Sequence, residues 1–489
     1  MSTPEWIQKK IQEVKNNNLT ELNLSYNQLS SLPSEITNLT NLTRLDLSDN
    51  QLSSLPSEIT NLTNLTSLDL RNNQLSSLPS EITNLTNLTR LYLDGNPLEN
   101  PPLEVCKQGI EAIREYFQKL EEEGYDTIYE AKFIIVGEAE SGKTSLMNKL
   151  LDPSYKVAQV EESTHGIGIR TLLFTCQEDQ EFRVNIWDFG GQEIYHQTHQ
   201  FFLTKRSLYG LVTDSRKEHC HLDYWLQIVE ILSENSPMMI IKNDKSGKVE
   251  IGNEGQIRDR FKVMIKDVLD TDLKTNKGLE RIDARMKEYI QELPHVGNKL
   301  PKAWARVREA IEKDERDYIS LDEYLKLCEE CNYKSEQKEQ EEQKDGRLIL
   351  SEFLHDLGVI LHFQKDKSSL LYDTVILKPE WGTQAVYELL KRENNPVKEK
   401  LGKFTFDDLE IIWGDTRYKG KSRELLELMK NFKLCYELKW VEPKTFIAPQ
   451  LLGEIPPQYQ WNPENNLRLI YQYDFMPKGI MSQLIVEMH

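Results

Sequence analysis

Leucines recur with a period of 23 residues between residues 19 and 102. The stretch "LTRLDLSDNQLSSLPSEITNLTN" begins at Leu42, near-identical copies begin at Leu65 and Leu88, and a fourth copy begins at Leu19. Each copy keeps its leucines at fixed places, with polar residues between them. This pattern predicts a stack of short strands and return turns around a shared row of buried leucines.

Segments with helical periodicity flank the repeats. Trp6, Ile7, Ile11 and Val14 fall on one helical face, which predicts an N-terminal capping helix within residues 1–18. Apolar residues at 110, 113, 117 and 120 predict an amphipathic helix in the connecting segment 103–129. The two helices would cover the open ends of the repeat stack.

The repeat matches L-x-x-L-x-L-x-x-N-x-L, the pattern of leucine-rich repeats. Its asparagines, which are expected to bond the exposed backbone amides of each turn, are Asn27, Asn50, Asn73 and Asn96. Polar side chains at the strand positions would line the concave face. They are compatible with an unknown protein ligand on the repeats, and equally with a solvated surface.

Strand-like apolar runs alternate with helical stretches from 130 to 295. The runs are "KFIIVG", "TLLFTC", "FRVNIWD", "SLYGLVTD" and "MMIIKN", with helices expected at 143–151 and 222–233. Such alternation predicts a mostly parallel sheet with helices on both faces. The predicted fold class is therefore multidomain α/β, with a short repeat solenoid before the sheet.

An α+β module is predicted for residues 296–457. It opens with helices at "AWARVREAIEKDE" and "SLDEYLKLCEE" and continues to an expected strand pair around 359–377. The polar stretch 333–346 is expected to be a mobile loop. The chain ends with "MPKGIMSQLIVEMH", which is expected to be part of a strand.

Composition narrows the function classes. The net charge of −19 over 489 residues disfavours nucleic acid as a partner. No apolar run is long enough to span a membrane and no secretory signal opens the chain, so a cytoplasmic location is expected. Cys328 and Cys331 have a metal-like spacing without further ligands, which favours ordinary half-buried cysteines over a zinc site.

The stretch "GEAESGKTSL", residues 137–146, follows a strand and opens a helix, as a phosphate-binding loop requires. Gly137 and Gly142 allow the turn and let backbone amides approach phosphates. Lys143 is expected to reach the β- and γ-phosphates, and Thr144 to offer its hydroxyl to Mg²⁺. The predicted nucleotide-binding residues of this loop are Gly137, Glu140, Ser141, Gly142, Lys143, Thr144 and Ser145.

The stretch "NIWDFGGQEIYH", residues 185–196, contains both a kinase-like D-F-G and a GTPase-like D-x-x-G-Q. No catalytic loop like H-R-D-x-x-x-x-N and no lysine strand like V-A-I-K accompanies it, which excludes the kinase interpretation. Asp188 ends a strand and is expected to hold Mg²⁺ through water. The Gly191 amide would meet the γ-phosphate, and Gln192 would orient the attacking water. Thr164 is expected to add a second hydroxyl ligand to the metal.

The base-recognition motif departs from the usual N-K-x-D. Asn243 takes the asparagine place, whereas Asp244 and Ser246 stand where lysine and aspartate are usual. Asp244 and Lys245 remain candidate base contacts. Guanine is favoured over adenine through the other motifs, while the altered order leaves base selectivity open. Ala139 replaces a common glycine beside the γ-phosphate position, which predicts slow hydrolysis.

Together these motifs resemble the Roco family, in which leucine-rich repeats precede a Ras-like Roc GTPase domain and a COR domain. The resemblance rests on "GEAESGKTSL", "STHGI", "WDFGGQEIYHQTHQFFLTKRSLY" and "LVTDSR", and further on "LPKAWARVREAI", "RDYISLDEYLKLCEE", "LHDLGVILHF" and "ILKPEW". It implies repeats at 19–102, Roc at 130–295, an N-terminal COR subdomain at 296–457 and an incomplete C-terminal COR subdomain at 458–489.

The resemblance also implies a homodimer formed through COR, which the incomplete C-terminal half would weaken. It implies a catalytic arginine, for which Arg216 is the better candidate and Arg206 the weaker, with a structural arginine as the alternative for both. The leading hypothesis is a Mg²⁺-dependent GTPase that converts GTP to GDP and phosphate and acts as a conformational switch. The alternative is a nucleotide-binding scaffold with negligible hydrolysis that works through its repeats.

Overall fold

The computed structural model describes residues 5–157, 166–176, 179–190, 202–204, 206–214, 222–233, 236–245, 254–334, 345–390, 395–414, 417–452, 472 and 480–488. The chain divides into two compact units. The first is built from Met1–Ile128, Pro294–Glu315 and Glu323–Leu354, and the second from Tyr129–Leu293, Arg316–Asp322 and His355–His489. The predicted COR module is therefore shared between the two units.

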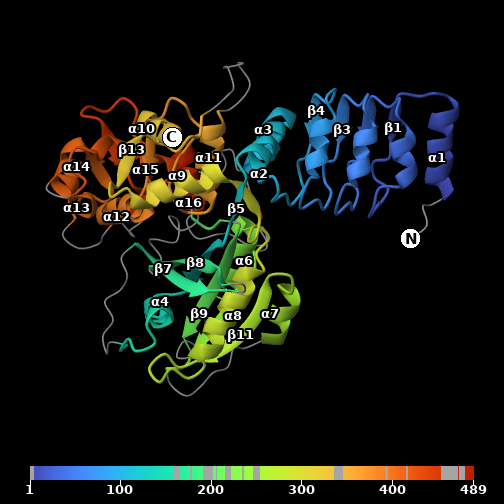
Figure 1. The fold of residues 1–489 in the computed structure, drawn as a ribbon. Helices are drawn as coiled ribbons and strands as arrows, with labels where there is room; N and C mark the ends of the chain where they lie inside the picture. The colour runs from blue at the N-terminus through green and yellow to red at the C-terminus, as the bar shows by residue number, and fades with distance from the viewer. Residues whose placement is uncertain are drawn as a thin grey trace, which may run out of the picture. The chain divides into compact units, whose positions relative to one another are not determined.

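The first unit begins with the repeats and their caps (Figure 1). Its elements are α1 (Glu5–Asn16), β1 (Glu21–Asn23), η1 (Ser34–Asn38), β2 (Arg44–Asp46), η2 (Ser57–Asn61), β3 (Ser67–Asp69), η3 (Ser80–Asn84), β4 (Arg90–Tyr92), α2 (Leu103–Cys106), α3 (Ile110–Glu122), β5 (Tyr125–Thr127), β12 (Lys299–Pro301) and α9 (Lys302–Lys313). Most residues of α10 (Leu321–Glu330) and α11 (Gly346–Asp356) also belong to this unit.

The repeats form the predicted solenoid, in which β1 to β4 pair in parallel in chain order. Partner residues are 23 positions apart, as with Leu22, Leu45 and Leu68. Their side chains are buried because one face of every short strand packs on the shared core. The predicted capping helix is confirmed as α1, which contacts β1 and buries three apolar side chains.

The repeat asparagines join neighbouring turns. The Nδ2 group of Asn73 donates to the carbonyl oxygens of Leu47 and Leu70 at 3.0 Å each, and its Oδ1 accepts from the amide of Leu52 at 3.0 Å. Asn50 and Asn96 make equivalent bonds. These three buried side chains confirm the predicted role of the repeat asparagines.

Asn73→Ala is expected to destabilise the solenoid locally by about 3 kcal/mol, since buried backbone groups lose their partners. Amide hydrogen exchange of peptides from the second and third repeats should then be about a hundredfold faster, as mass spectrometry can measure. Asn87→Ala is the matched control, because Asn87 is exposed and donates to the Thr63 carbonyl at 2.8 Å. Equal effects of both substitutions would contradict the assigned role.

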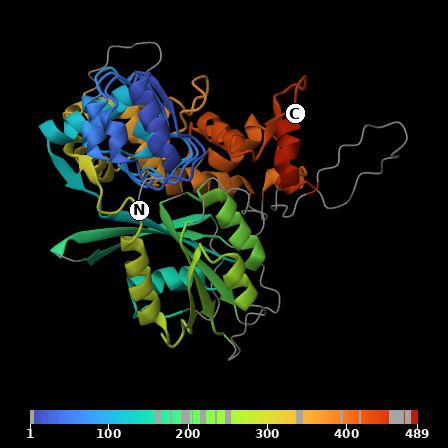
Figure 2. The same cartoon turned by 90° about the vertical axis from the view of Figure 1, so that its right-hand side faces the viewer.

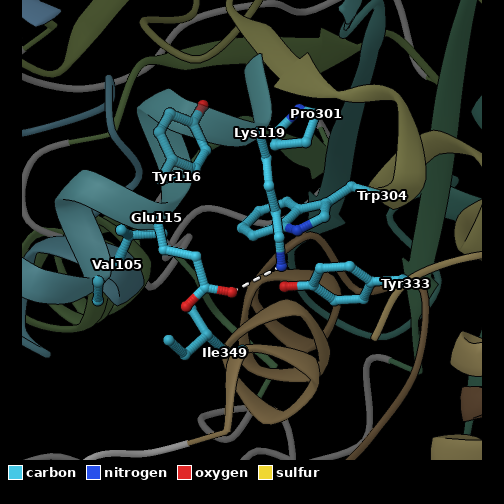
Figure 3. Close-up of a pocket in the computed structure, with 10 residues that line it drawn as sticks. Val105, Glu115, Tyr116, Lys119, Pro301, Trp304, Tyr333 and Ile349 are labelled. Atoms are coloured by element: carbon cyan, nitrogen blue, oxygen red, sulfur yellow. Dashed lines mark hydrogen bonds and ion pairs between the residues drawn. The ribbon is translucent and has the colours of Figure 1, made fainter. Parts of the chain in front are cut away.

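Helix α3 packs the end of the repeats onto α9 and its neighbours. The Nζ of Lys119 pairs with a Glu115 carboxylate oxygen at 2.6 Å and lies 4.4 Å from the centre of the Tyr333 ring. Tyr116 packs edge-on against Trp304, with ring centroids 5.9 Å apart. Figure 3 shows these side chains converging on one narrow pocket. The repeats and the first COR helices therefore belong to one packed unit.

Strands β5 and β12 flank residues 129–293 in the sequence and pair with each other. The pairing is antiparallel, with Tyr125 opposite Pro301 and Thr127 opposite Lys299. The chain therefore leaves the first unit and returns to it at adjacent positions, and residues 129–293 form an insertion between two paired strands.

The second unit contains a six-stranded sheet in the order β11-β10-β9-β6-β8-β7, in which only β7 is antiparallel to its neighbour. The strands and helices are β6 (Glu130–Val136), α4 (Lys143–Leu151), β7 (Ile167–Thr175), β8 (Glu181–Phe189), β9 (Ser207–Asp214), α6 (Leu222–Ser233), β10 (Met238–Asn243), α7 (Glu254–Arg260), β11 (Ile265–Thr271) and α8 (Leu279–Gln291). Helices α4 and α8 contact each other over one face, and α6 lies over the other (Figure 2). The predicted sheet with helices on both faces is confirmed.

The COR part of the second unit shares a core with this sheet. Its elements are β13 (Tyr318–Ser320), β14 (Thr374–Ile376), α12 (Pro379–Leu390), α13 (Pro396–Glu399), β15 (Lys403–Thr405), α14 (Phe406–Trp413), α15 (Ser422–Asn431), β16 (Tyr436–Glu437), β17 (Thr445–Ile447), η6 (Pro449–Leu451) and α16 (Ile480–Met488). One buried cluster contains Trp187 and Phe202 from the sheet side together with Trp381, Tyr387 and Phe432. The sheet and these helices therefore pack as one body.

One prediction for the last module is wrong, and another holds only in part. The expected C-terminal strand is the helix α16, because Ile480, Leu484 and Met488 recur every four residues, a spacing that favours a helix. The strand pair expected around 359–377 is reduced to a bridge between Leu361 and Ile376, since β14 pairs with β13 instead. Within the predicted loop 333–346, residues 335–344 lie outside the described residues.

Of the two cysteines with metal-like spacing, Cys331 is half-buried and Cys328 is fully buried. Cys328 is buried on α10, and burial raises the pKa of its thiol to about 12. In the described ranges, no group of three or more His, Cys, Asp or Glu side chains is arranged to hold a metal ion. Also within those ranges, no helix combines the length and the apolar character needed to cross a bilayer.

Candidate nucleotide-binding site

The turn between β6 and α4 contains three residues with positive φ, a backbone conformation that favours glycine. Gly137, Glu140 and Gly142 have φ values of 140°, 62° and 103°. A Cβ atom on Gly137 would lie 2.3 Å from the Val212 carbonyl oxygen, and one on Gly142 would lie 2.4 Å from the Asn243 Nδ2. Both glycines are therefore required by close packing as well as by backbone conformation.

Hydrogen-bond donors converge on this turn. The buried Lys143 donates from Nζ to the Glu138 carbonyl oxygen at 2.6 Å. Helix α4 starts at the same lysine, and its first amides have no partner within the helix. The hydroxyls of Ser141 and Ser145 are buried and, among the described residues, make no hydrogen bond. Donors, a positive helix end and a lysine in one loop fit an anionic phosphate group.

An oxygen pair suited to a hard cation lies beside the loop. The Thr144 hydroxyl donates to Oδ2 of Asp188 at 2.6 Å, and Asp188 has no exposed surface. The two residues come from the start of α4 and the end of β8, next to β6. Hydroxyl and carboxylate oxygens are ligands that Mg²⁺ accepts, so these residues fit the predicted metal.

The ends of β9 and β10 are tied to the phosphate loop. Asn243 donates from Nδ2 to the Ser141 carbonyl oxygen at 2.9 Å. The Nζ of Lys245 donates to the Glu140 carbonyl oxygen at 2.7 Å and lies 3.9 Å from a carboxylate oxygen of Asp214. The predicted base-side residues thus meet the predicted phosphate-side residues. The amide of Asp244 is held by the Thr271 carbonyl oxygen of β11 at 2.7 Å.

Sequence reasoning passed over Asp214, which is nearly fully buried at the end of β9. The rule that ligands bind at the carboxyl ends of parallel strands could have found it, since it closes the run "SLYGLVTD". Four predicted site residues, Thr164, Gly191, Gln192 and Arg216, lie outside the described residues.

Arg206 is placed away from the phosphate loop. It is a buried residue just before β9, at the amino end of that strand, with a left-handed φ of 58°. The phosphate loop follows the carboxyl end of the parallel strand β6. One strand length, about 25 Å, therefore separates Arg206 from the loop of its own chain.

Helix α12 contacts the chain that follows the first predicted switch. The Gly190 amide donates to the Gly166 carbonyl oxygen at 2.9 Å, and a Cβ on Gly166 would lie 2.7 Å from the Tyr387 ring. A Glu380 carboxylate oxygen accepts from the Ile169 amide at the start of β7. Two residues of α12 thus touch the chain that follows Thr164, and Gly166 links that chain to Gly190, which precedes Gly191.

Three family models match consecutive parts of the chain. They are described as "Leucine-rich repeat region" for residues 9–101, "Ras of Complex, Roc, domain of DAPkinase" for residues 132–246, and "C-terminal of Roc, COR-A domain" for residues 301–452. The order of the matches is that of the solenoid, the sheet and the last module.

Two curated relatives cover much of this chain. A probable serine/threonine-protein kinase, pats1, from Dictyostelium discoideum is 28% identical over 424 residues, which is 78% of this chain and 13% of the relative. A Roc-COR-CHAT protease from an unknown prokaryotic organism is 29% identical over 414 residues, which is 78% of this chain and 37% of the relative. The chain thus spans less than two thirds of either relative.

A solved structure gives a more complete match. It is that of Methanosarcina barkeri Roco2 RocCORdC bound to GDP, with 34% identity, a TM-score of 0.55 and coverage of 67% of this chain and 97% of that one. The Roc match at residues 132–246 and the COR-A match at residues 301–452 agree with this likeness. The chain therefore belongs to the Roco family and has the leucine-rich repeat, Roc and COR-A architecture of that family.

Proposed function

We propose that this chain is a Mg²⁺-dependent GTPase of the Roco family that switches conformation between its GTP and GDP states. The observation that carries the proposal is the phosphate loop, with Thr144 bonded to Asp188 on one side and Ser141 bonded to Asn243 on the other. These bonds join the residues proposed for the metal, the phosphates and the base at the carboxyl ends of neighbouring strands, which supports the proposal. The GDP bound by the M. barkeri relative supports guanine as the base.

Each predicted residue has a role in this proposal. Lys143 and the amides at the start of α4 hold the phosphates, while Thr144, Thr164 and Asp188 hold the metal. Bound Mg²⁺ would neutralise the charge that develops on the phosphate oxygens. Gln192 orients the attacking water, and the amide of Gly191 binds the γ-phosphate.

Further residues complete the predicted site. The remaining loop contacts are assigned to Gly137, Glu140, Gly142 and Ser145, and the base contacts to Asn243, Asp244 and Lys245. Arg216 is proposed to stabilise charge on the transferred phosphoryl group. Arg206 is set aside because of its place at the other end of β9.

The COR part is proposed to respond to the bound nucleotide through α12. Gly166 follows the segment that contains Thr164, and Gly190 directly precedes Gly191. Both glycines are therefore close in the chain to residues proposed to meet the γ-phosphate. Tyr387 packs on Gly166, which places a COR side chain directly on this connection. Pairing of two copies through COR is part of the same proposal.

The second candidate is a nucleotide-binding scaffold with negligible hydrolysis, working through the repeat surface. Ala139 favours it, because a methyl group beside the γ-phosphate would crowd the catalytic glutamine. The altered base motif also favours it, since Lys245 is already engaged by the Glu140 carbonyl oxygen and by Asp214. The two candidates share nucleotide binding and differ in turnover.

Calorimetric titration tests base selectivity directly. Nucleotide-stripped protein is titrated with GDP and, separately, with ADP, each in the presence of Mg²⁺. We expect GDP to bind at least about a hundredfold more tightly, because a site built to bond one base leaves polar groups unpaired with another. Comparable affinity for both nucleotides would contradict guanine selectivity and support a general nucleotide-dependent scaffold.

A further inference from the structure

A lysine outside the nucleotide site is buried in the Roc sheet. Lys132 lies on β6 and is 2% exposed. Its Nζ donates to the Phe202 carbonyl oxygen at 3.1 Å and to the Thr204 hydroxyl at 3.3 Å, and lies 4.0 Å from the centre of the Trp187 ring. The Nζ atom of Lys132 therefore contacts two separate parts of the chain.

These contacts lie on both sides of the catalytic motif in the sequence. Trp187 directly precedes Asp188, whereas Phe202 and Thr204 follow Gln192 by about ten residues. The two sides also touch each other, since the Trp187 and Phe202 ring centroids are 6.0 Å apart. Lys132 therefore holds together the residues between which the metal-binding aspartate and the catalytic glutamine lie.

A turn of COR-A closes over the same lysine. Gly358 has a φ of 73°, and a Cβ there would lie 2.9 Å from Cζ2 of Trp187 and 3.1 Å from Nζ of Lys132. The turn follows α11, and the carboxylate at the end of that helix, Asp356, acts electrostatically on Lys132. The Phe202 ring continues into COR-A through Phe432, with centroids 5.3 Å apart.

We propose that Lys132 is a positioning residue for GTP hydrolysis, which connects the COR-A turn at Gly358 to both sides of the segment that carries Asp188 and Gln192. This inference rests on the proposed GTPase function. Lys132 touches no nucleotide-binding residue of the phosphate loop. It acts by holding Trp187 and Phe202 in one arrangement, so that a shift of the COR-A turn changes the placement of the catalytic motif.

The charge of Lys132 is not explained by fold stability. Burial lowers its pKa to about 7, and Asp356 acts in the opposite direction. The folded-state pKa lies below the ordinary value of 10.5, so the charged lysine destabilises the folded state. This destabilisation is complete below pH 7 and disappears as the pH rises towards 10.5. Burial also lowers the pKa of the neighbouring His355, to about 4, so this imidazole is neutral at pH 7.

Lys132→Met tests the proposal, since methionine keeps the length and removes the donors. We expect single-turnover phosphate release to be about tenfold slower, with GDP affinity within about twofold and no lower thermal midpoint at pH 7. Lys149→Met is the matched control. Lys149 is also buried, and its Nζ donates to the Pro153 carbonyl oxygen at 3.1 Å, away from Trp187 and Phe202.

Gly358→Ala is the second variant and removes no charge. Its Cβ would press on Trp187 and Lys132, and we expect a comparable loss of rate, by about tenfold. Gly420→Ala is its control, because Gly420 has a φ of 75° but a Cβ there would meet no atom within 4 Å. The control carries the same backbone strain without the contact, so its rate should equal that of the unmodified chain.

Several outcomes overturn the inference. Unchanged hydrolysis in Lys132→Met does so. So does slower hydrolysis in Lys132→Met together with a lower thermal midpoint, if Gly358→Ala keeps the full rate. Equal rate losses in a variant and its matched control also count against it. Absence of hydrolysis in the unmodified chain removes the proposed function and the inference together, whereas normal hydrolysis with unaffected variants removes the inference alone.

Discussion

Lys143→Met is expected to weaken GDP binding by about a thousandfold, which corresponds to about 4 kcal/mol. Lys143 is buried at the first residue of α4, and its Nζ already lies within the phosphate loop. Methionine has nearly the same length but carries no charge and no donor, so the phosphates lose a charge-assisted contact in a desolvated place. Calorimetry with nucleotide-stripped variant protein and Mg²⁺ measures the loss.

A lysine of the same helix provides the control for this substitution. Lys149→Met removes another buried ammonium group from α4, at a site that faces the Pro153 carbonyl oxygen and not the phosphate loop. GDP affinity should change by less than about threefold in this variant. A GDP affinity in Lys143→Met within tenfold of the original would refute the phosphate-binding role.

Gln192→Leu is expected to slow single-turnover GTP hydrolysis by about a hundredfold while GDP affinity stays within about twofold. The glutamine is proposed to orient the attacking water, an interaction that matters in the transition state and not in the GDP complex. Rapid mixing of excess protein with GTP, followed by phosphate detection, measures the chemical step separately from product release.

The same assay separates the two candidate functions. A rate unaffected by Gln192→Leu would count against an enzymatic role and favour the nucleotide-binding scaffold. Arg216→Ala belongs in this series, since unchanged turnover would exclude that arginine from the mechanism. Gln197→Leu is a suitable control, because it makes the same change five positions further along the same stretch.

Local patterns were sufficient to predict the regular parts of the fold. The solenoid follows from leucines spaced every 23 residues, because each unit buries its face only on an identical neighbour. The predicted sheet strands follow from short apolar runs between helices, and the phosphate loop from glycines in a strand–turn–helix context. The strand β11 was overlooked, since "IKDVLDT" interleaves its apolar residues with charged ones.

The candidate site was predictable in part for the same reason. Its residues lie in short motifs at the ends of strands, and parallel strands bring their carboxyl ends to one edge. Asn243 and Ser141 are bonded although 102 positions separate them, a contact for which the sequence suggested only a shared edge. The contacts of Lys245 with the Glu140 carbonyl oxygen and with Asp214 join residues far apart in the sequence, so they could be seen only in the folded chain.

The sequence by itself established the order of modules, the repeat architecture and the phosphate-binding motif, since each depends on residues close together in the chain. Tertiary structure decided how the modules are divided: β5 pairs with β12 across the whole Roc insertion, and COR-A is shared between two packed units. It alone placed Lys132 between Trp187, Phe202 and Gly358. Such contacts depend on packing between distant segments, and periodicity along the chain carries no information about them.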